Sequence, residues 1–438
     1  MTSSTLSRVV VRGGALRGEL RPPPDKSITH RAVFLSALAQ GTSRITHPLA
    51  ADDCERSAEA FRALGISIES DARGQWVVVG HGLYGLREPA ADHIYCGNSG
   101  TTMRLITGVL SGQPFATKLM GDKSLSSRPM GRVVEPLQQM GADILAREGK
   151  FAPLRVHGRR PLRAIQWKSP VPSAQVKSAL LLAGLYADGV TTIEEPQRSR
   201  DHSERMLAAA GVKLTIDERR VSIEGGQSLK PRDWVVPSDI SSAAFFLVAA
   251  SIAPGSELML RNVNTNPTRD GVLEVLARMG ANIRRENEAV IGGEPVTDLL
   301  VRFAPLRATS FGGDIVPRLV DEIPVLALAA TQADGVTEIR GAQELRVKES
   351  DRLAQIAKGL SALGAQVQEL PDGLRIEGPT PLIGATLDAA GDHRLSMTYA
   401  VAGLIARGET RIQDAECVDI SFPTFWTDFE RVRVQAHA

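Results

Sequence analysis

Cationic and hydroxyl residues occur together where the chain turns sharply into a helix. In "PPPDKSITHR" (22–31), a proline run stiffens the backbone, and Lys26, Ser27 and Arg31 follow at once. "GDKSLSSRPM" (121–130) is similar and contains Arg128. Helix amino ends present unpaired N–H groups and a positive dipole end, and Arg and Lys suit carboxylate and phosphate oxygens. These segments predict sockets for a small, highly anionic set of ligands.

Other segments add cations and carboxylates of the same kind. "GNSGTTMR" (97–104) and "SAQVKSALLLAG" (173–184) bring Arg104 and Lys177 to helix starts, and "GDHRLS" (391–396) brings Arg394. "RLVDEIP" (318–324) and "LRVKESDR" (345–352) supply Asp321 and Glu349, which are acid–base candidates because neighbouring cations can tune a carboxyl pKa. Each cation could instead belong to a solvated surface pair, and Asp321 could serve as a helix cap. Simple N-caps are the alternative for the hydroxyl residues Ser27, Thr101, Ser173 and Ser241.

Composition excludes several classes of function. The net charge is +1 and aromatic residues make up 4%, which argues against a nucleic-acid binder. No P-loop, dinucleotide fingerprint, GxSxG elbow or zinc spacing occurs. Three scattered cysteines, Cys54, Cys96 and Cys417, fit a reducing cytosol. The apolar stretches 178–187 and 243–252 are too short to cross a bilayer and predict buried helices.

The elements that must position these residues repeat along the chain. Six copies of a polar cluster followed by an Ala/Leu-rich helix and a short strand begin about 70 to 80 residues apart, at Ser27, Ser99, Ser173, Ser241, Asp321 and Asp392. In most copies a second helix ends at a glycine turn, as in "FRALGISIE" (61–69). Six such copies in 438 residues are too many for a single hydrophobic core. We therefore expect two domains of three copies each, divided near Pro237. A single repeat array without a cleft is the alternative.

Eight segments together resemble the 5-enolpyruvylshikimate-3-phosphate synthase family, particularly its second bacterial class. They are "DKSITHR", "GNSGTTMR", "GDKSLSSRPM", "SAQVKSALLLAG", "RLVDEIP", "LRVKESDR", "GDHRLSM" and "SFPTF". They occur in the family's order over nearly the whole chain. The resemblance implies an α+β fold of two similar domains, 1–24 with 238–438 and 25–237. Each domain would have three βαβαββ units, and the active site would lie in the inter-domain cleft.

The resemblance also implies the reaction and its residues. The enolpyruvyl group of phosphoenolpyruvate would pass to the 5-hydroxyl of shikimate 3-phosphate through a tetrahedral intermediate, releasing phosphate on the route to chorismate. Asp321 would act as base, Glu349 would handle the methylene proton, and Lys26 would be the third catalytic residue. Contacts to shikimate 3-phosphate would come from Lys26, Ser27, Arg31, Ser173, Ala174, Gln175, Asp321 and Lys348. Contacts to phosphoenolpyruvate would come from Lys26, Gly100, Arg128, Gln175, Arg352 and Arg394.

The same resemblance implies a cytoplasmic monomer without metal, organic cofactor, nucleic-acid or membrane partner, and with glyphosate as an inhibitor. In the family, alanine at the position of Gly100 is one route to glyphosate tolerance. Gly100 lacks the alanine methyl group, so we expect no glyphosate tolerance by that route. Three positions depart from the first class of the family: Ile420 replaces a lysine, Pro23-Pro24 replaces Pro-Gly, and Ser173-Ala174 replaces a serine pair. Three rivals remain: a UDP-N-acetylglucosamine enolpyruvyl transferase, which typically bears a reactive loop cysteine, an RNA 3′-phosphate cyclase, and an inactive anion-binding relative.

Overall fold

Two units, each with its own hydrophobic core, make up the chain in the computed structural model, which describes residues 8–435. Within that range, unit 1 consists of residues 8–23, 238–289 and 295–435, and unit 2 consists of residues 24–237 and 290–294. Pro24 thus belongs to unit 2, and so does the tip of a hairpin at 290–294, which no sequence pattern separates from its neighbours.

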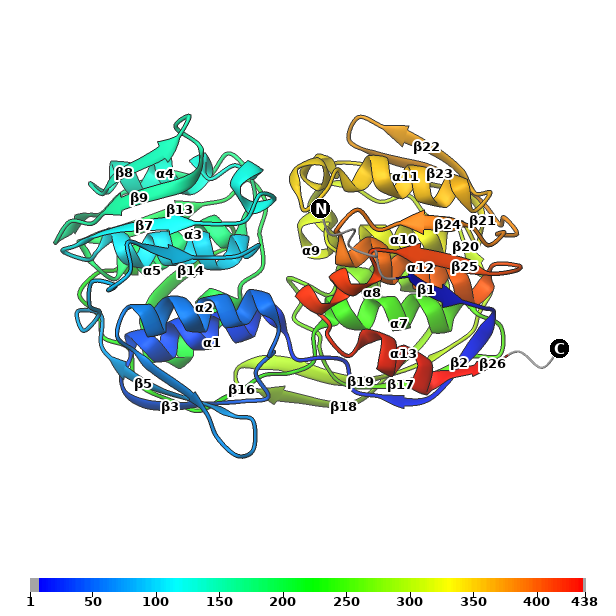
Figure 1. Ribbon diagram of the computed structural model, residues 1–438, viewed down its shortest axis with the longest axis horizontal. Helices are drawn as coiled ribbons and strands as arrows, with labels where there is room; N and C mark the ends of the chain where they lie inside the picture. The colour runs from blue at the N-terminus through cyan, green and yellow to red at the C-terminus, as the bar shows by residue number, and fades with distance from the viewer. Residues whose placement is uncertain (1–7, 436–438) are drawn as a thin grey trace, which may run out of the picture. The chain divides into compact units, whose positions relative to one another are not determined.

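Unit 2 alternates helices and short strands (Figure 1). Its helices are α1 (Lys26–Leu38), α2 (Asp52–Ala63), α3 (Gly100–Ser111), α4 (Gly131–Gln139), α5 (Ala174–Gly184) and α6 (His202–Ala209). Its strands are β3 (Gln40–Thr46), β4 (Ser67–Ser70), β5 (Trp76–His81), β6 (His93–Tyr95), β7 (Ala116–Met120), β8 (Asp143–Arg147), β9 (Phe151–His157), β10 (Leu162–Arg163), β11 (Gln166–Lys168), β12 (Ala187–Asp188), β13 (Val190–Glu194), β14 (Leu214–Asp217), β15 (Arg220–Glu224) and β16 (Trp234–Val235).

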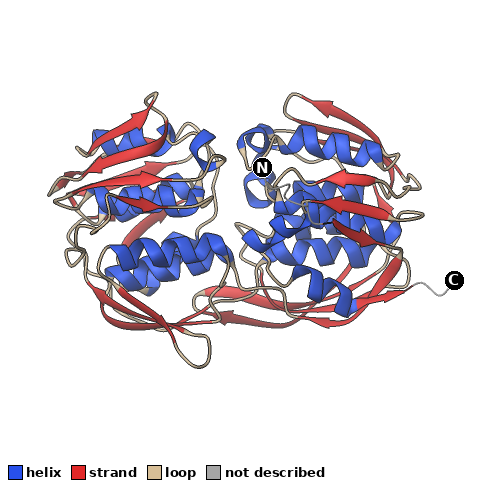
Figure 2. Ribbon diagram, in the orientation of Figure 1, coloured by secondary structure: helices blue, strands red, loops and turns tan. Residues whose placement is uncertain are grey.

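One strand-pairing pattern occurs three times in residues 24–237, all of which the structure describes. The sheets run in the orders β16-β3-β5-β4, β6-β7-β9-β8 and β11-β13-β15-β14. In each sheet the first pair is parallel and the next two pairs are antiparallel. The sheets lie over the helices, which therefore form the interior (Figure 2). The repeated pattern is the structural counterpart of the first three sequence copies.

Unit 1 carries the other three copies. Its helices are α7 (Ile240–Ile252), α8 (Gly271–Arg278), α9 (Val316–Leu319), α10 (Ile323–Ala330), α11 (Arg352–Ala362), α12 (His393–Ile405) and α13 (Phe425–Val432). Its strands are β1 (Arg8–Val11), β2 (Gly14–Leu20), β17 (Glu257–Asn264), β18 (Asn282–Ile291), β19 (Glu294–Arg302), β20 (Leu306–Arg307), β21 (Ala333–Ile339), β22 (Gln366–Leu370), β23 (Gly373–Gly378), β24 (Thr386–Asp388), β25 (Thr410–Gln413) and β26 (Arg433–Gln435).

The N-terminal strands complete two sheets of unit 1. The sheet β20-β21-β23-β22 repeats the pattern of unit 2. In β18-β19-β17-β2-β26, strand β2 is the parallel partner of β17. In the sheet of the last copy, β1-β25-β24, strand β1 is the antiparallel partner of β25. The last copy therefore borrows a strand from the other end of the chain, which explains its atypical sequence.

Residue pattern accounts for the positions of the helices. Every residue of α7 is buried, and α5 is buried from Val176 onward, as the uniformly apolar sequences predict. The glycine after the second helix of a repeat has a positive φ, for example 87° at Gly65 and 90° at Gly364, and thus ends the helix. Within residues 8–435, no helix combines the length and the apolar character needed to cross a bilayer.

Candidate active site

Arg352 is the centre of a carboxylate cluster in unit 1. This side chain is 1% exposed, and its Nε donates to Asp392 Oδ2 at 2.7 Å. Its Nη2 donates to Glu349 Oε2 at 2.6 Å, and its Nη1 lies 3.4 Å from Asp321 Oδ1. Burial opposes the guanidinium charge, but Asp392, Glu349 and Asp321 outweigh it and raise the pKa of Arg352 above its ordinary value. Arg352 therefore remains a cation at the start of α11.

Two further cations approach Asp321. Lys348 Nζ lies 3.7 Å from Asp321 Oδ1. Arg394 Nη1 donates to the backbone carbonyl of Asp321 at 3.2 Å, and Arg394 Nε lies 4.0 Å from Oδ1. Unit 1 thus brings together all five residues that the sequence predicted there, Asp321, Lys348, Glu349, Arg352 and Arg394. Two carboxylates able to transfer protons stand among three cations able to bind anions.

Helix starts hold this cluster in place. Asp392 is fully buried and caps α12 by accepting from the backbone N–H of Arg394 at 3.0 Å. It also accepts from Ser350 Oγ at 3.0 Å, next to Glu349. Asp321, in contrast, does not cap α10, whose N-cap position is Glu322. The Asp321 carboxylate faces the cations instead, so the alternative of a simple helix cap is wrong.

The start of α1 carries three predicted residues of unit 2. Lys26 Nζ donates to Asp53 Oδ2 at 2.9 Å, and both side chains are less than one-fifth exposed. Arg31 is buried and donates to the backbone carbonyl of Ser27 at 2.9 Å. The other guanidinium nitrogens of Arg31 donate to Ser178 Oγ at 2.8 Å and to Ser203 Oγ at 2.7 Å. Arg31 therefore fixes the turn at Ser27 and joins α1 to α5 and α6.

The starts of α3 and α5 are joined through Gln175. Its Oε1 accepts from Arg104 Nη1 at 2.7 Å, and its Nε2 donates to Thr101 Oγ1 at 2.9 Å. Gly100 is the first residue of α3, and a Cβ added there would lie 2.6 Å from Arg104 Nη1. Gly100 consequently leaves the space in which Arg104 reaches Gln175.

Three more predicted residues of unit 2 lie at a helix start or at a turn. Ser173 caps α5 by accepting from the backbone N–H of Val176, and Ala174 is the first residue of that helix. Arg128 is 8% exposed and donates to Asn98 Oδ1 and, at 3.2 Å, to Ser124 Oγ. All three residues therefore lie at a helix start or a turn, as their sequence context predicted.

Several sequence interpretations need correction. Lys177 is not a ligand socket, because its ammonium group is buried between Glu195 and Glu204, 2.8 Å from each. Among the suggested hydroxyl N-caps only Ser173 caps a helix with its side chain; the caps of the other three helices are Asp25, Ser99 and Asp239.

Sequence reasoning also missed partners that are distant along the chain. Asp53, which binds Lys26, is 27 residues away, and Ser203, which binds Arg31, is 172 residues away. No local pattern signals either contact. Ile420, which stands where the first family class has a lysine, is half-buried at the end of the turn Ala415–Ile420.

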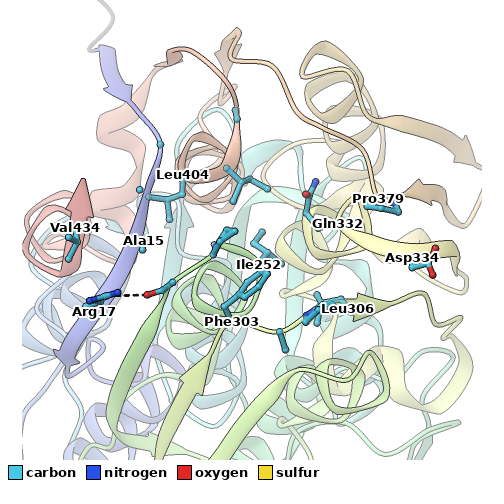
Figure 3. Close-up of a pocket in the computed structure, with 18 residues that line it drawn as sticks. Ala15, Arg17, Ile252, Phe303, Leu306, Gln332, Asp334, Pro379, Leu404 and Val434 are labelled. Carbon is cyan, nitrogen blue, oxygen red and sulfur yellow. Dashed lines mark hydrogen bonds between the residues drawn. The ribbon is translucent and has the colours of Figure 1, made fainter. Parts of the chain in front are cut away.

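A cavity of about 810 Å³ lies elsewhere in unit 1 (Figure 3). Its lining includes Ile252, Gln332 and Leu404, which lie at the carboxyl ends of α7, α10 and α12. The candidate residues of unit 1 lie at the opposite, amino ends of α10, α11 and α12, where helix dipoles favour anions. None of the predicted site residues lines this cavity.

Comparisons with known proteins agree with the geometry. The family described as EPSP synthase (3-phosphoshikimate 1-carboxyvinyltransferase) matches residues 10–429. The chain is 51% identical to the 3-phosphoshikimate 1-carboxyvinyltransferase of Geobacter sulfurreducens, covering 96% of this chain and 98% of that one. It is 55% identical to the protein of the same name from Gloeobacter violaceus, covering 96% and 97%.

Solved structures give the same result. The EPSP synthase of Acinetobacter baumannii matches with a TM-score of 0.88 and 41% identity, covering 98% of this chain and 99% of that one. The sequence matches and the structural match extend over both units. The chain therefore belongs to the EPSP synthase (3-phosphoshikimate 1-carboxyvinyltransferase) family.

Proposed function

We propose that this chain transfers the enolpyruvyl group of phosphoenolpyruvate to the 5-hydroxyl of shikimate 3-phosphate and releases phosphate. Family membership and 51% identity to a named 3-phosphoshikimate 1-carboxyvinyltransferase support the reaction. The observation that carries the mechanism is the joint attachment of Asp321 and Glu349 to Arg352. One buried cation holds two proton-transfer groups beside a place for anionic substrates.

The proposed chemistry divides the proton transfers between the two carboxylates. Asp321 accepts the proton of the 5-hydroxyl as that oxygen bonds to C2 of phosphoenolpyruvate, while Glu349 delivers a proton to C3. In the second step C3 returns a proton to Glu349, the C2–O bond to phosphate breaks, and the double bond forms again. The hydroxyl proton that Asp321 accepted leaves with the phosphate, so both carboxylates return to their starting state. Charge is greatest in the tetrahedral intermediate, so fixed cations such as Arg352 and Arg394 stabilise it most.

Binding roles follow the family motifs residue by residue. For shikimate 3-phosphate we assign the residues of unit 2 that gather at the starts of α1 and α5, and Asp321 and Lys348 of unit 1; the unit 2 set is Lys26, Ser27, Arg31, Ser173, Ala174 and Gln175. For phosphoenolpyruvate we assign Lys26, Gly100, Arg128, Gln175, Arg352 and Arg394. Both units supply residues to this set, so both are required for catalysis.

We further propose that the enzyme is a cytoplasmic monomer, needs no cofactor and is inhibited by glyphosate at the phosphoenolpyruvate site. The buried thiols of Cys54, Cys96 and Cys417 support a reducing compartment. They also disfavour the UDP-N-acetylglucosamine rival, which relies on a reactive cysteine. Burial raises the pKa of all three thiols, that of Cys96 to about 12, so each stays protonated at neutral pH.

Phosphate release from phosphoenolpyruvate tests the proposal. Release by the wild type should require shikimate 3-phosphate, and Glu349→Gln should lower kcat by at least about a hundredfold because the proton at C3 loses its carrier. Glu369→Gln is the matched control. Glu369 lies exposed on strand β22, and among the described residues its carboxylate pairs only with Arg346. No release with shikimate 3-phosphate would refute the function, and release with UDP-N-acetylglucosamine would favour the rival.

A further inference from the structure

A buried charge cluster lies beneath the start of α5. Lys177 and Glu195 are each 3% exposed in their side chains, and Glu204 is 6% exposed. Lys177 Nζ lies 2.8 Å from Glu195 Oε2 and 2.8 Å from Glu204 Oε1. Burial lowers the pKa of Lys177, but the two carboxylates outweigh burial and raise it, so the ammonium group persists. Such a cluster is costly to bury unless its charges are paired and hydrogen-bonded.

The two carboxylates differ in what else they contact. Glu195 Oε1 accepts from the backbone N–H of Ser173 at 3.2 Å, and Oε2 accepts from the backbone N–H of Ser199 at 3.2 Å. Three donors, with Lys177, therefore converge on one carboxylate. Glu204 Oε2, in contrast, is buried and has no hydrogen-bond partner among the described residues. Glu195 thus connects the backbone at Ser173 and at Ser199 to Lys177. Glu204, in contrast, contributes an ion pair with the ammonium group of Lys177.

Ser173 is the N-cap of α5, with an extended backbone (φ −143°, ψ 105°) and with its hydroxyl accepting from Val176. A residue in this position has no intrahelical partner for its own N–H, so an external acceptor decides where it lies. Gln175 is held from the other side by Arg104 and Thr101. Without Glu195, the start of α5 would be fixed on one side only.

We infer that Glu195 is a positioning residue for shikimate 3-phosphate: by holding the Ser173 N–H it sets the place of the segment 173–175 that receives this substrate. The inference rests on the proposed function. Glu195 touches no reacting atom, so it acts on substrate binding and not on the proton transfers. A carboxylate is needed because an amide would turn its NH₂ group either toward the N–H of Ser173 or toward both Lys177 and the N–H of Ser199.

Two isosteric variants separate positioning from charge pairing. Glu195→Gln and Glu204→Gln each remove one carboxylate at the same distance from Lys177, but only Glu195 contacts Ser173. Glu195→Gln should raise KM for shikimate 3-phosphate about tenfold, the size expected for one charge-assisted hydrogen bond. Its kcat and its KM for phosphoenolpyruvate should change less than about twofold, as should all constants of Glu204→Gln.

Equal KM values for shikimate 3-phosphate in the two variants, or a loss confined to kcat, would overturn the inference. If Glu195→Gln does not fold, the same comparison of KM for shikimate 3-phosphate is made between Glu195→Asp and Glu204→Asp. Aspartate keeps the negative charge, but its shorter side chain withdraws the carboxylate oxygens from Ser173. A wild type that releases no phosphate with shikimate 3-phosphate would refute the proposed function, and the inference with it. An active wild type with two indistinguishable variants would refute only the role of Glu195.

Discussion

At the scale of single residues, His30 illustrates how a buried group couples stability to pH. Its Nδ1 lies 2.8 Å from Ser57 Oγ, which lies 2.8 Å from Thr102 Oγ1, so the imidazole links α1, α2 and α3. Burial, together with Lys26 and Arg31, holds the pKa of His30 well below its ordinary value of 6.5. The folded protein therefore keeps His30 neutral under conditions in which the unfolded chain binds a proton.

This difference predicts a loss of stability in mild acid. As the pH falls below 6.5, the His30 imidazole binds a proton in the unfolded state but stays neutral in the folded state. The free energy of unfolding therefore decreases. The contribution of His30 reaches at most about 1.4 kcal/mol per pH unit. Thermal unfolding at about pH 7.5 and about pH 5.5 should show a smaller decrease in Tm for His30→Asn than for the wild type. An equal decrease in both proteins would assign the acid sensitivity to other groups.

Gly100 is a second residue at which one added atom should have a measurable effect. The methyl group of Gly100→Ala would lie 2.6 Å from Arg104 Nη1, whose guanidinium can move because it ends a flexible side chain. Arg104 would then lose its hold on Gln175. We expect KM for phosphoenolpyruvate and the inhibition constant of glyphosate to rise together by about tenfold or more, with a smaller change in KM for shikimate 3-phosphate.

The wild-type enzyme, which has glycine at position 100, should be sensitive to glyphosate. It should be inhibited by glyphosate in the concentration range in which it binds phosphoenolpyruvate, because Gly100 leaves the site open. Inhibition of the wild type only at far higher concentrations would contradict the proposal. Gly131→Ala serves as a control, since its methyl would meet only Lys150, at 3.3 Å.

At the scale of elements, the sequence predicted the repeat, its glycine stops and its buried helices, because these depend on local patterns. It did not decide between neighbouring capping residues. Asp25 and Ser27 are both residue types that favour the N-cap position, and in the structure Asp25 caps α1. The backbone N–H of Asp25 donates to the carbonyl oxygen of Pro237 at 2.7 Å and holds Asp25 in that position. Such a contact joins residues about two hundred positions apart, so no local pattern contains it. The partners of Arg31 and Lys177 were missed for the same reason.

The packing of α3 on α5 offers a prediction about whole helices. A Cβ at Gly108 would lie 2.2 Å from the carbonyl oxygen of Ala179, and backbone atoms cannot swing aside as a side chain can. Gly108→Ala should separate the two helices, destabilise unit 2 by about 1–3 kcal/mol and lower kcat/KM, because α3 and α5 carry Gly100 and Gln175.

Thermal unfolding and steady-state kinetics check this prediction against Gly131→Ala, which adds the same methyl group in α4 of the same unit. A Tm and a kcat/KM unchanged from the wild type would show that the two helices can separate at little cost. The segment "RLITGVLSG" does not reveal this constraint. A glycine inside a helix is usually replaceable by alanine, and only the position of the neighbouring helix shows that Gly108 is not.

At the scale of the whole molecule, the distribution of the cores makes unit 2 a candidate for independent folding. All buried apolar residues of its core fall between Ile28 and Val236. The chain enters this unit at Pro24 and leaves it at Pro237, and the Asp25 N–H joins the two ends. A fragment of residues 24–237 therefore keeps its entire core and needs no new loop closure.

The fragment should fold cooperatively but be less stable than the same unit in the full chain. It lacks residues 290–294, and with them Glu294, whose Oε1 lies 2.8 Å from the buried Nδ1 of His202. Leaving that nitrogen without its partner costs about 1–3 kcal/mol. His202→Asn should consequently destabilise the full chain more than the fragment, as measured by thermal unfolding followed by circular dichroism. An equal effect in both would show that Glu294 contributes nothing, and a fragment without a cooperative transition would show that unit 2 depends on unit 1 to fold.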